Sequence, residues 1–559
     1  MHIGIGQNIL RVHQRQPLLL AGILFLCGIY LGYASFSMAW RWMSAGAALC
    51  AMAFLVRKIR GQASGLHGAD LVWIGLCSLF LGMGRAAWDR AGREEECTWL
   101  AHAETKSTST LSCQIGPDVL ATTIRGHTVR YTFKAFDVRV QTPQGDQPLR
   151  YLPLTVNWYA SDEDKAQAPK AGEHWRFRGR LTLATSRRSP LLLATLNTGK
   201  SETRSMRLSN AEASAWPLRL AQVRHEARRR MALGIEDWPV APALSQAMLL
   251  GCAYEMPASM RRIFSESGTV HVFAVSGLHI AFVVGLLMLL AGMTGLKRIH
   301  WIFLIAPLLI GYTLITGARP SAIRACMMAL FVFLAPLLGR RPTMLSALMV
   351  TAWVVHAWRP DFIFDVGSVL SFAVMAGLIA FMGPFCKLFQ TLFGCEKLRR
   401  YEEMLRVAGR ARKADWIHRG GAVLRFVADT LAVSLAAWLA SVPLTGYYFG
   451  RFTPGGLLAN LVITPCAGLI VVAGTLGLIT SFIQTWLAIT FNHAAGVLTM
   501  LMVRVAEQTA ATPGLGFNTG KWAFWQVVLW LAGLAALAAW IAWRARPKDG
   551  LAWLTDEEK

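Results

Sequence analysis

Charged residues are scarce in this chain: they make up 16% of its 559 residues, against about a quarter in an ordinary soluble domain. Hydrophobic residues make up 54%, and the mean hydropathy is +0.41. Nearly uncharged runs recur at about the length a helix needs to cross a bilayer, at residues 17–39, 272–293, 302–315, 366–385, 457–483 and 524–543. With shorter runs at 42–56 and 343–358, the composition predicts an α-helical polytopic membrane protein of about twelve transmembrane helices.

Catalytic and metal-binding signatures are missing as well. The ten cysteines show no metal spacing, and the pair His225-Glu226 lacks the second histidine of a zinc-protease helix. Residues 194–201 fit a relaxed phosphate-loop pattern, but alanine replaces its first glycine and no helix pattern follows. We therefore expect no catalytic residue, no metal, no cofactor and no enzymatic activity.

Positive charge is in excess, with a net charge of +24. The positive-inside rule explains it if the basic segments are cytoplasmic, and the largest of them, residues 387–425, carries ten basic and four acidic residues. Twelve spans then place both termini in the cytoplasm and residues from about 89 to 215 outside. The first run is too long for a signal peptide, so we expect a retained helix. Such an excess also suits a polyanionic substrate.

A polar region over residues 90–210 changes the pattern to short strands. Residues 152–158 and 175–183 alternate apolar with polar or small side chains. In residues 129–140 the apolar phase switches at Ala135-Phe136, which predicts a bulge. Many short strands within roughly 110 residues suit a small β-barrel, and we expect an inserted, external all-β domain of OB-like fold.

Two groups of residues in this predicted domain are candidates for function. Arg176, Arg178 and Arg180 share one face of a strand, and OB-type barrels hold single strands with basic grooves and stacking aromatics. A solvated strand face is the alternative. Cys97 and Cys113 fall in a place predicted to be oxidising, where they are candidates for a disulfide.

Residues 211–240 predict a basic amphipathic helix. One stripe is apolar and the remainder is ringed by arginines, the two sets being Leu220, Val223, Ala227 and Met231, and Arg219, Arg224, Arg228, Arg229 and Arg230. This pattern is typical of an interfacial helix lying on the bilayer. Contact with lipid headgroups is the simpler interpretation, and contact with a substrate is the alternative.

Four polar segments interrupt the apolar runs after residue 241. Ionisable groups inside a span cost several kcal/mol unless they face a cavity or a partner. The first segment contains His271, Ser276, Gly277 and His279. The histidines, eight residues apart, share a face of a continuous helix, unless Ser276-Gly277 breaks it as in carriers whose unwound segments line a cavity. Packed histidines bonded to backbone carbonyls are the alternative.

The second segment contains Arg319, Ser321 and Arg324. Pro320 predicts the first turn of a helix, with Arg319 at its mouth and Arg324 about one turn inside. An arginine in a span must meet a carboxylate, a polar cavity or a phosphate. Ion pairs with Asp361 or Asp365 are the alternative to a functional role.

The third and fourth segments contain the remaining candidates. Asp365 and Ser371 lie where another span begins, and an aspartate there either neutralises an arginine or caps the helix. The fourth segment runs from Phe449 through Arg451 to Asn460. Its glycines, prolines and aromatics suit a re-entrant or pore-lining loop, with an interfacial aromatic belt as the alternative.

In this order the four segments resemble the membrane core of the ComEC family, the channel that admits transforming DNA across the bacterial inner membrane. The likeness lies in residues 268–279, 317–325, 365–372 and 449–460, and residues 172–181 are similar to the family's OB-like N-terminal domain. It implies transmembrane helices over residues 1–89, a channel core over 241–510, and a last span with a short cytoplasmic tail over 511–559. The chain departs from the family in two ways. We expect it to lack the C-terminal metallo-β-lactamase-like domain that many members carry. It also has Cys252 where many members have an acidic residue, so the role of that acidic residue is either displaced to Glu255 or lost.

The resemblance implies passage of single-stranded DNA along a hydrated path through the core. That path would be lined by the candidates of the four segments, namely His271, Ser276, Gly277, His279, Arg319, Ser321, Arg324, Asp365, Ser371, Phe449, Arg451 and Asn460. The implied partners are single-stranded DNA, an external DNA receptor, cytoplasmic helicase or DNA-binding proteins, the bilayer, and a nuclease acting in trans. A small-solute or proton-coupled transporter is the alternative, although no internal repeat is evident, and an envelope-directed membrane enzyme ranks last.

Overall fold

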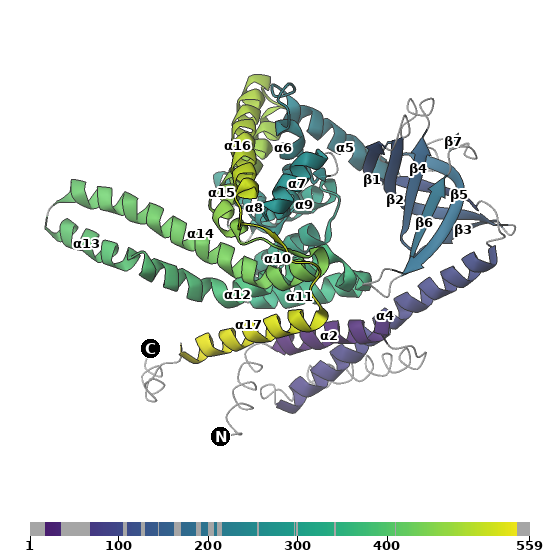
Figure 1. Cartoon of the computed structure of the whole chain (residues 1–559), viewed down its shortest axis with the longest axis horizontal. Helices are drawn as coiled ribbons and strands as arrows, with labels where there is room; N and C mark the ends of the chain where they lie inside the picture. The colour runs from purple at the N-terminus through teal and green to yellow at the C-terminus, as the bar shows by residue number, and fades with distance from the viewer. Residues whose placement is uncertain are drawn as a thin grey trace. The chain divides into compact units, whose positions relative to one another are not determined.

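The computed structural model is mostly helical, with one small β region (Figure 1). It describes residues 17–34, 68–103, 109–123, 129–142, 145–160, 169–170, 172–185, 192–198, 206–208, 215–253, 256–295, 297, 300–339, 343–408 and 410–544. The predicted span at 42–56, Glu255 and the predicted tail after residue 544 lie outside these residues. The chain divides into two compact units, one comprising Met1–Pro257, Val272–Val369 and Gly468–Met500, the other Ala258–His271, Leu370–Ala467 and Leu501–Lys559.

The β region, in the first unit, is a closed barrel. Its strands are β1 (Ser109–Thr123), β2 (Val129–Thr142), β3 (Gly145–Leu149), β4 (Leu154–Ala160), β5 (His174–Thr185), β6 (Leu192–Thr198) and β7 (Met206–Arg207). The long strands follow the order β1-β2-β4-β6-β5, and β5 pairs back onto β1. All these pairs are antiparallel except β4 with β6, which is parallel. The barrel therefore buries one side chain of every two along each strand.

The alternation predicted for this region is confirmed. Trp158, Trp175 and Phe177 are at most 2% exposed and pack inside the barrel, where each large apolar side chain contributes about 1.5–3 kcal/mol. The predicted irregularity near Ala135 is also confirmed: β1–β2 pairing moves from Ser112–Arg139 to Gln114–Phe136, so β2 carries an extra residue. Asp137, next to that shift, has a φ of 45°.

The helices occupy most of the remaining chain. Their bounds are α2 (Pro17–Ala34), α4 (Gly68–Ala103), α5 (Ala215–Ala232), α6 (Ala241–Leu250), α7 (Ala258–Glu266), η4 (Val270–Phe273), α8 (Gly277–Met293), α9 (Trp301–Ile315), α10 (Pro320–Leu337), α11 (Met344–Trp358), η6 (Pro360–Phe364), α12 (Val366–Leu392), α13 (Cys395–Val407), α14 (Ala411–Phe449), α15 (Gly455–Thr480), α16 (Thr485–Ala511) and α17 (Phe524–Arg544). Two short strands, β8 (Arg451–Phe452) and β9 (Phe517–Asn518), pair with each other.

Helix α4 continues past the predicted domain boundary at residue 89. Its polar second half is supported by ion pairs one turn apart, Arg93–Asp89 at 2.8 Å and Arg90–Glu94 at 2.9 Å. Its apolar half lies beside α2 (Figure 1). That approach requires glycine, because a Cβ on Gly28 would lie 2.0 Å from the carbonyl oxygen of Leu79.

Six helices among the described residues are long and apolar enough to cross a membrane, and they lie within α10, α12, α14, α15, α16 and α17. Shorter apolar helices occur at Ala21–Tyr33, Ala241–Leu250, Gly277–Met293, Trp301–Ile315 and Met344–Trp358. One of these shorter helices is α8, which begins only at Gly277, whereas the sequence predicted a span from residue 272. The count of about twelve spans stays a prediction.

Candidate functional site

Of the two alternatives for the first polar segment, the structure has the broken helix, so His271 and His279 do not share a continuous helix. The short helix η4 ends at Phe273 and α8 begins at Gly277, with Ser276 as its N-cap. The Ser276 N–H donates a hydrogen bond to Nδ1 of His279, and the Ser276 hydroxyl lies 3.0 Å from the same nitrogen. His279 is 1% exposed. Its imidazole therefore fixes the start of α8.

The second segment makes a turn between α9 and α10. Gly317 and Ala318 both have positive φ, and α10 begins at Pro320 with Arg319 as its N-cap, as predicted. The Ser321 hydroxyl donates to the carbonyl of Val275 at 2.7 Å. This bond ties the start of α10 to the break before α8.

Three donors converge on the C-terminal end of α6. Tyr312 donates to the carbonyl of Leu249, Arg224 to that of Leu250 and Arg319 to that of Gly251, at 2.9, 3.0 and 2.6 Å. Cations at a helix C-terminus are favoured because the carbonyls there carry partial negative charge. The end of α6 thus packs against α5 and the α9–α10 turn.

The burial of Arg224 differs from what the sequence predicted. This arginine was expected in an exposed basic ring on an interfacial helix, but it is 4% exposed. Its neighbours Arg228 and Arg230 are half-buried and donate to Gln246 and to the carbonyl of Ser481. Val223, predicted on the buried stripe, is 50% exposed. Ala227 and Met231 of the same stripe are buried as predicted.

Arg324 lies one turn inside α10 and is 3% exposed. Its Nη2 lies 3.0 Å from where a Cβ on Gly277 would stand, so the absent side chain makes room for the guanidinium. Gly277 is the first residue of α8, where unpaired N–H groups carry partial positive charge. We call Gly251, Ser276, Gly277, His279, Arg319, Ser321 and Arg324 the helix-break cluster, in which Gly251, His279 and Arg324 are buried and the other residues are half-buried.

The aspartates proposed as partners of these arginines have other contacts. Asp361 accepts hydrogen bonds from Arg359 at 2.9 and 2.8 Å and lies 3.8 Å from Arg93. Asp365 accepts from the N–H of Ser368 at 2.8 Å and caps α12. Burial alone would raise the pKa of Asp361, but the hydrogen bonds and charge of Arg359, with the charge of Arg93, hold it below its ordinary value.

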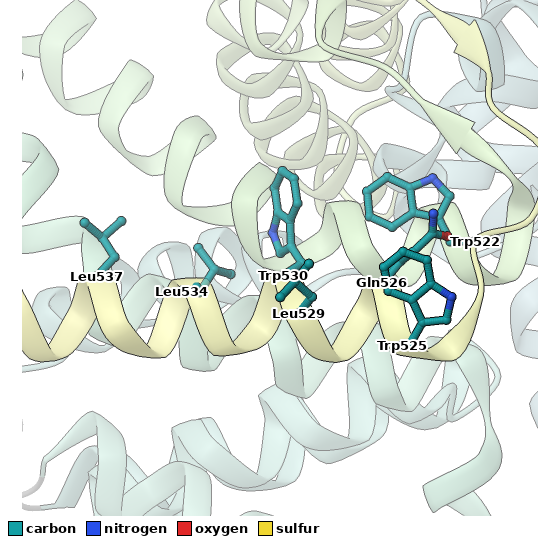
Figure 2. Close-up of a pocket in the computed structure, with 8 residues that line it drawn as sticks. Trp522, Trp525, Gln526, Leu529, Trp530, Leu534 and Leu537 are labelled. Atoms are coloured by element: carbon teal, nitrogen blue, oxygen red, sulfur yellow. The ribbon is translucent and has the colours of Figure 1, made fainter.

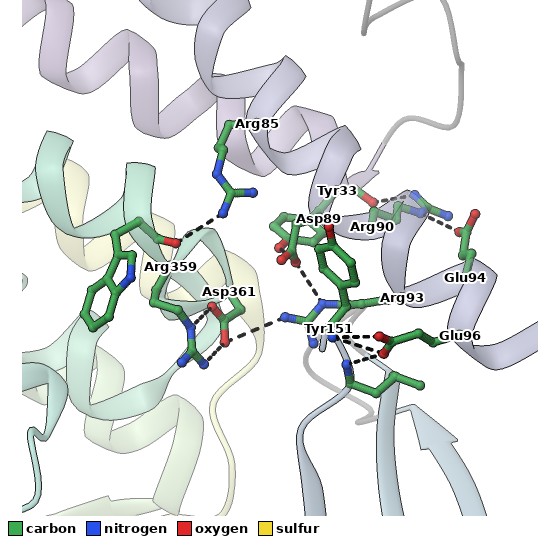
Figure 3. A network of polar contacts seen from close by, with 12 residues as sticks. Tyr33, Arg85, Asp89, Arg90, Arg93, Glu94, Glu96, Tyr151, Arg359 and Asp361 are labelled. Atoms are coloured by element: carbon green, nitrogen blue, oxygen red, sulfur yellow. Dashed lines mark hydrogen bonds and ion pairs between the residues drawn. The ribbon is translucent and has the colours of Figure 1, made fainter. Parts of the chain in front are cut away.

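Asp361 belongs to a polar network that the sequence did not reveal (Figure 3). Asp89 of α4 accepts from Arg93 at 2.8 Å and from the hydroxyl of Tyr33 on α2. Arg85 donates to the carbonyls of Ala357 and Trp358. The network therefore joins α2, α4 and the loop after α11. The sequence signal that could have indicated this network is the four-residue spacing of Asp89 and Arg93, which suits an ion pair on a helix.

Helix α4 also contacts the barrel, through Glu96. Its carboxylate accepts hydrogen bonds from the N–H groups of Arg150, Tyr151 and Leu152 at 2.6–3.0 Å (Figure 3). Gly92 lies against the ring of Tyr151, where a Cβ would come within 2.7 Å. Bonds from a buried carboxylate to several N–H groups are stronger than neutral ones, so α4 and the β3–β4 connection are firmly joined.

The second unit contains the other path candidates. Arg451 donates to the hydroxyl of Ser265 at 2.9 Å, and Asn460 has a buried Oδ1 that finds no hydrogen-bond partner within the described ranges. Phe449 is 58% exposed at the end of α14. His271 is exposed in η4, and Ser371 is half-buried in α12.

A groove of about 610 Å³ runs along α17 in the same unit (Figure 2). It is lined by Trp522, Trp525, Gln526, Leu529, Trp530, Gly533, Leu534 and Leu537. A lining with one amide and no charge suits an acyl chain rather than a polyanion. None of the predicted path residues lines this groove.

The barrel candidates are placed as follows. Arg176, Arg178 and Arg180 are exposed on β5. Cys97 and Cys113 are both free thiols, so the predicted disulfide is not formed in this structure. Burial raises the pKa of Cys113, and burial together with Glu96 and Glu94 raises that of Cys97. Across the described part of the chain no three His, Cys, Asp or Glu residues form a group that could hold a metal ion.

Comparison with known proteins gives two findings. The model of the competence protein family matches residues 248–544. The chain is also 26% identical to ComE operon protein 3 of Bacillus subtilis (strain 168) over 230 residues, which is 41% of this chain and 25% of that relative. The match thus spans about a quarter of the relative's length. No solved structure matches the chain.

Proposed function

Because the chain belongs to the competence protein family, of the ComEC type, we propose that it is a channel of the bacterial inner membrane that passes single-stranded DNA into the cytoplasm. The match over the helical core is the observation that carries this proposal. The matched region contains the whole helix-break cluster and the four polar segments. We assign the protein no catalytic step.

The helix-break cluster supplies what such a strand needs. Each nucleotide carries one negative charge, and bare hydrocarbon cannot replace the water around it. Guanidinium groups meet phosphates with planar, charge-assisted hydrogen bonds, and Arg319 and Arg324 lie beside the break before α8. Unwound backbone at membrane depth is tolerated where it lines a hydrated cavity. The buried cations and the broken helices thus have a common explanation.

The barrel would capture the strand outside the membrane. We infer an OB-type barrel, because five strands close in the order β1-β2-β4-β6-β5 with one parallel pair. A row of polar side chains crosses its outer surface: Thr132 donates to Asn157, Asn157 donates to Asn197, and Arg180 is in register with Asn197. Such a row beside exposed arginines suits a polar backbone rather than a lipid surface.

The proposed topology follows the charge distribution. About twelve spans would leave residues from about 89 to 215 outside and both termini in the cytoplasm. An external DNA receptor would deliver DNA to the barrel, and a nuclease acting in trans would provide the single strand. Cytoplasmic helicase or DNA-binding proteins would draw that strand inward.

A deletion strain tests this function. We expect its transformation frequency with marked DNA to fall to background and a plasmid copy to restore it. The Arg324→Ala copy should transform at least about tenfold less well, since a lost charge-assisted contact costs ~1.5–3 kcal/mol. Arg324→Lys should recover part of this, because it keeps the charge without the planar fork.

The matched control is Arg262→Gln. Arg262 is an exposed arginine on α7 that pairs with Glu266, and its loss should leave transformation unchanged. Immunoblotting of membranes checks that all variants accumulate equally. A deletion strain that transforms at the parental frequency would overturn the proposed function.

A further inference from the structure

The helices α13 and α14 form a hairpin (Figure 1). Helix α14 has 39 residues and is therefore ~58 Å long, about twice the hydrocarbon core. Its last basic residue before the apolar half is Arg425, so its basic turns occupy ~20 Å of the helix. We call residues 395–425 the basic hairpin.

The acidic residues of the basic hairpin are largely used within it. Glu402 pairs with Arg406 at 2.9 Å and with His418 at 3.1 Å. Glu403 pairs with Arg399, and Asp415 with Arg406. These contacts hold α13 against α14, and they leave Glu396 as the only acidic residue of the hairpin without an ion pair among the described residues.

The remaining cations face outward. Lys397, Arg400, Arg410, Lys413, Arg419 and Arg425 are all exposed, and none pairs with a carboxylate in the described ranges. Exposed cations without partners are hydrated and available to a polyanion. Since the internal ion pairs neutralise the acids, the positive field of the hairpin is not cancelled locally.

Exposed aromatic side chains lie among these cations. Tyr401 is 51% exposed and Trp416 is 74% exposed. The contacts Glu402–His418 and Arg406–Asp415 fix the register of the two helices, so Tyr401 lies level with Arg419. Trp416 lies level with Met404, which is 62% exposed.

We propose that the basic hairpin binds single-stranded nucleic acid, with cations on the phosphates and Tyr401 and Trp416 stacked on bases. Basic surfaces interleaved with aromatics bind single strands without reading sequence. A lipid surface that contacts the same cations is the competing outcome of the test below. The assignment, which rests on the proposed function, takes the hairpin to be cytoplasmic, as its basic residues indicate.

The test uses the full-length protein in nanodiscs of zwitterionic lipid and a fluorescent oligodeoxythymidylate. The triple variant Lys397→Gln, Arg400→Gln, Arg419→Gln should lower the slope of log affinity against log salt by about 2, since each single-strand phosphate contributes ~0.7. Trp416→Ala should weaken binding about tenfold through lost stacking. None of these residues takes part in the ion pairs that hold the hairpin together.

Matched controls are Trp486→Ala and Arg262→Gln, whose side chains are similarly exposed outside the hairpin. Neither should change the affinity or the salt slope. Unchanged affinity and slope in both hairpin variants would overturn the assignment. Loss of binding to phosphatidylglycerol vesicles with normal binding of the oligonucleotide would overturn it in favour of a lipid surface.

The experiments can disprove the hairpin assignment and the channel proposal independently of each other. If the deletion strain transforms normally while the hairpin variants lose oligonucleotide binding, the channel function falls and the binding site stands. If the deletion abolishes transformation while the hairpin variants bind and transform like the wild type, the hairpin assignment falls alone.

Discussion

Buried arginines are the residues on which the proposed path depends. Arg224 and Arg319 each donate to a carbonyl at the end of α6, which gives both a structural role. A guanidinium has five N–H donors in a planar fork, so a carbonyl bond and a phosphate contact are compatible in one side chain. Arg324 lies instead beside the first residue of α8, and it is the more sensitive probe of function.

Gly277 offers a mild way to move that guanidinium. In Gly277→Ala the new Cβ would lie 3.0 Å from Nη2 of Arg324, and the end of a flexible side chain can yield. We expect transformation to fall severalfold while the thermal unfolding temperature changes little. Gly285→Ala on the same helix is the control, since nothing lies within 4 Å of its Cβ. Equal transformation by the two variants would contradict a role for the Arg324 position.

Among the elements, α4 joins the barrel to the helical part of the first unit. Its carboxylate Glu96 serves three backbone N–H groups of the barrel, and its Arg93 reaches Asp361. A polar group of this kind is costly to remove, because the buried donors lose their acceptor while the surrounding protein excludes water.

Glu96→Ala should therefore loosen the junction by about 2 kcal/mol. Hydrogen exchange measures this directly, and the amides of residues 150–152 should exchange faster. Glu94→Ala is the control, because the half-exposed pair with Arg90 contributes at most ~1 kcal/mol. Protection of those amides that is unchanged in Glu96→Ala would show that α4 does not hold the barrel.

Elements with a strong local pattern could be predicted from the sequence. Alternation at residues 152–158 and 175–183 predicted the barrel strands, and Ser276-Gly277 gave the break before α8 as one of two alternatives, because both signals act within a few residues. The contact of Asp361 with Arg93 could not be predicted, since Arg93 is distant in the sequence and only the fold brings them together. Arg224 was misjudged because a helical stripe does not say which face meets protein.

At the scale of the whole molecule, positive charge gathers in three places, two of them in the first unit and one in the second. Exposed arginines lie on β5 of the barrel, buried ones lie in the helix-break cluster, and exposed cations cover the basic hairpin. The net charge of +24 exceeds what one binding site needs. The proposed passage of a polyanion would use all three places, whereas the positive-inside rule alone would explain the basic hairpin.

Photo-crosslinking of a stalled strand tests most directly whether DNA passes the helix-break cluster. Competent cells would take up DNA whose trailing end carries a bulky group, with p-benzoyl-phenylalanine placed at Leu278, next to Gly277, or at Leu289 on the same helix; these positions are 40% and 66% exposed. We predict a crosslink to the strand from position 278 and none from position 289. Crosslinks of equal yield at both positions, or at 289 alone, would contradict a path beside Arg324.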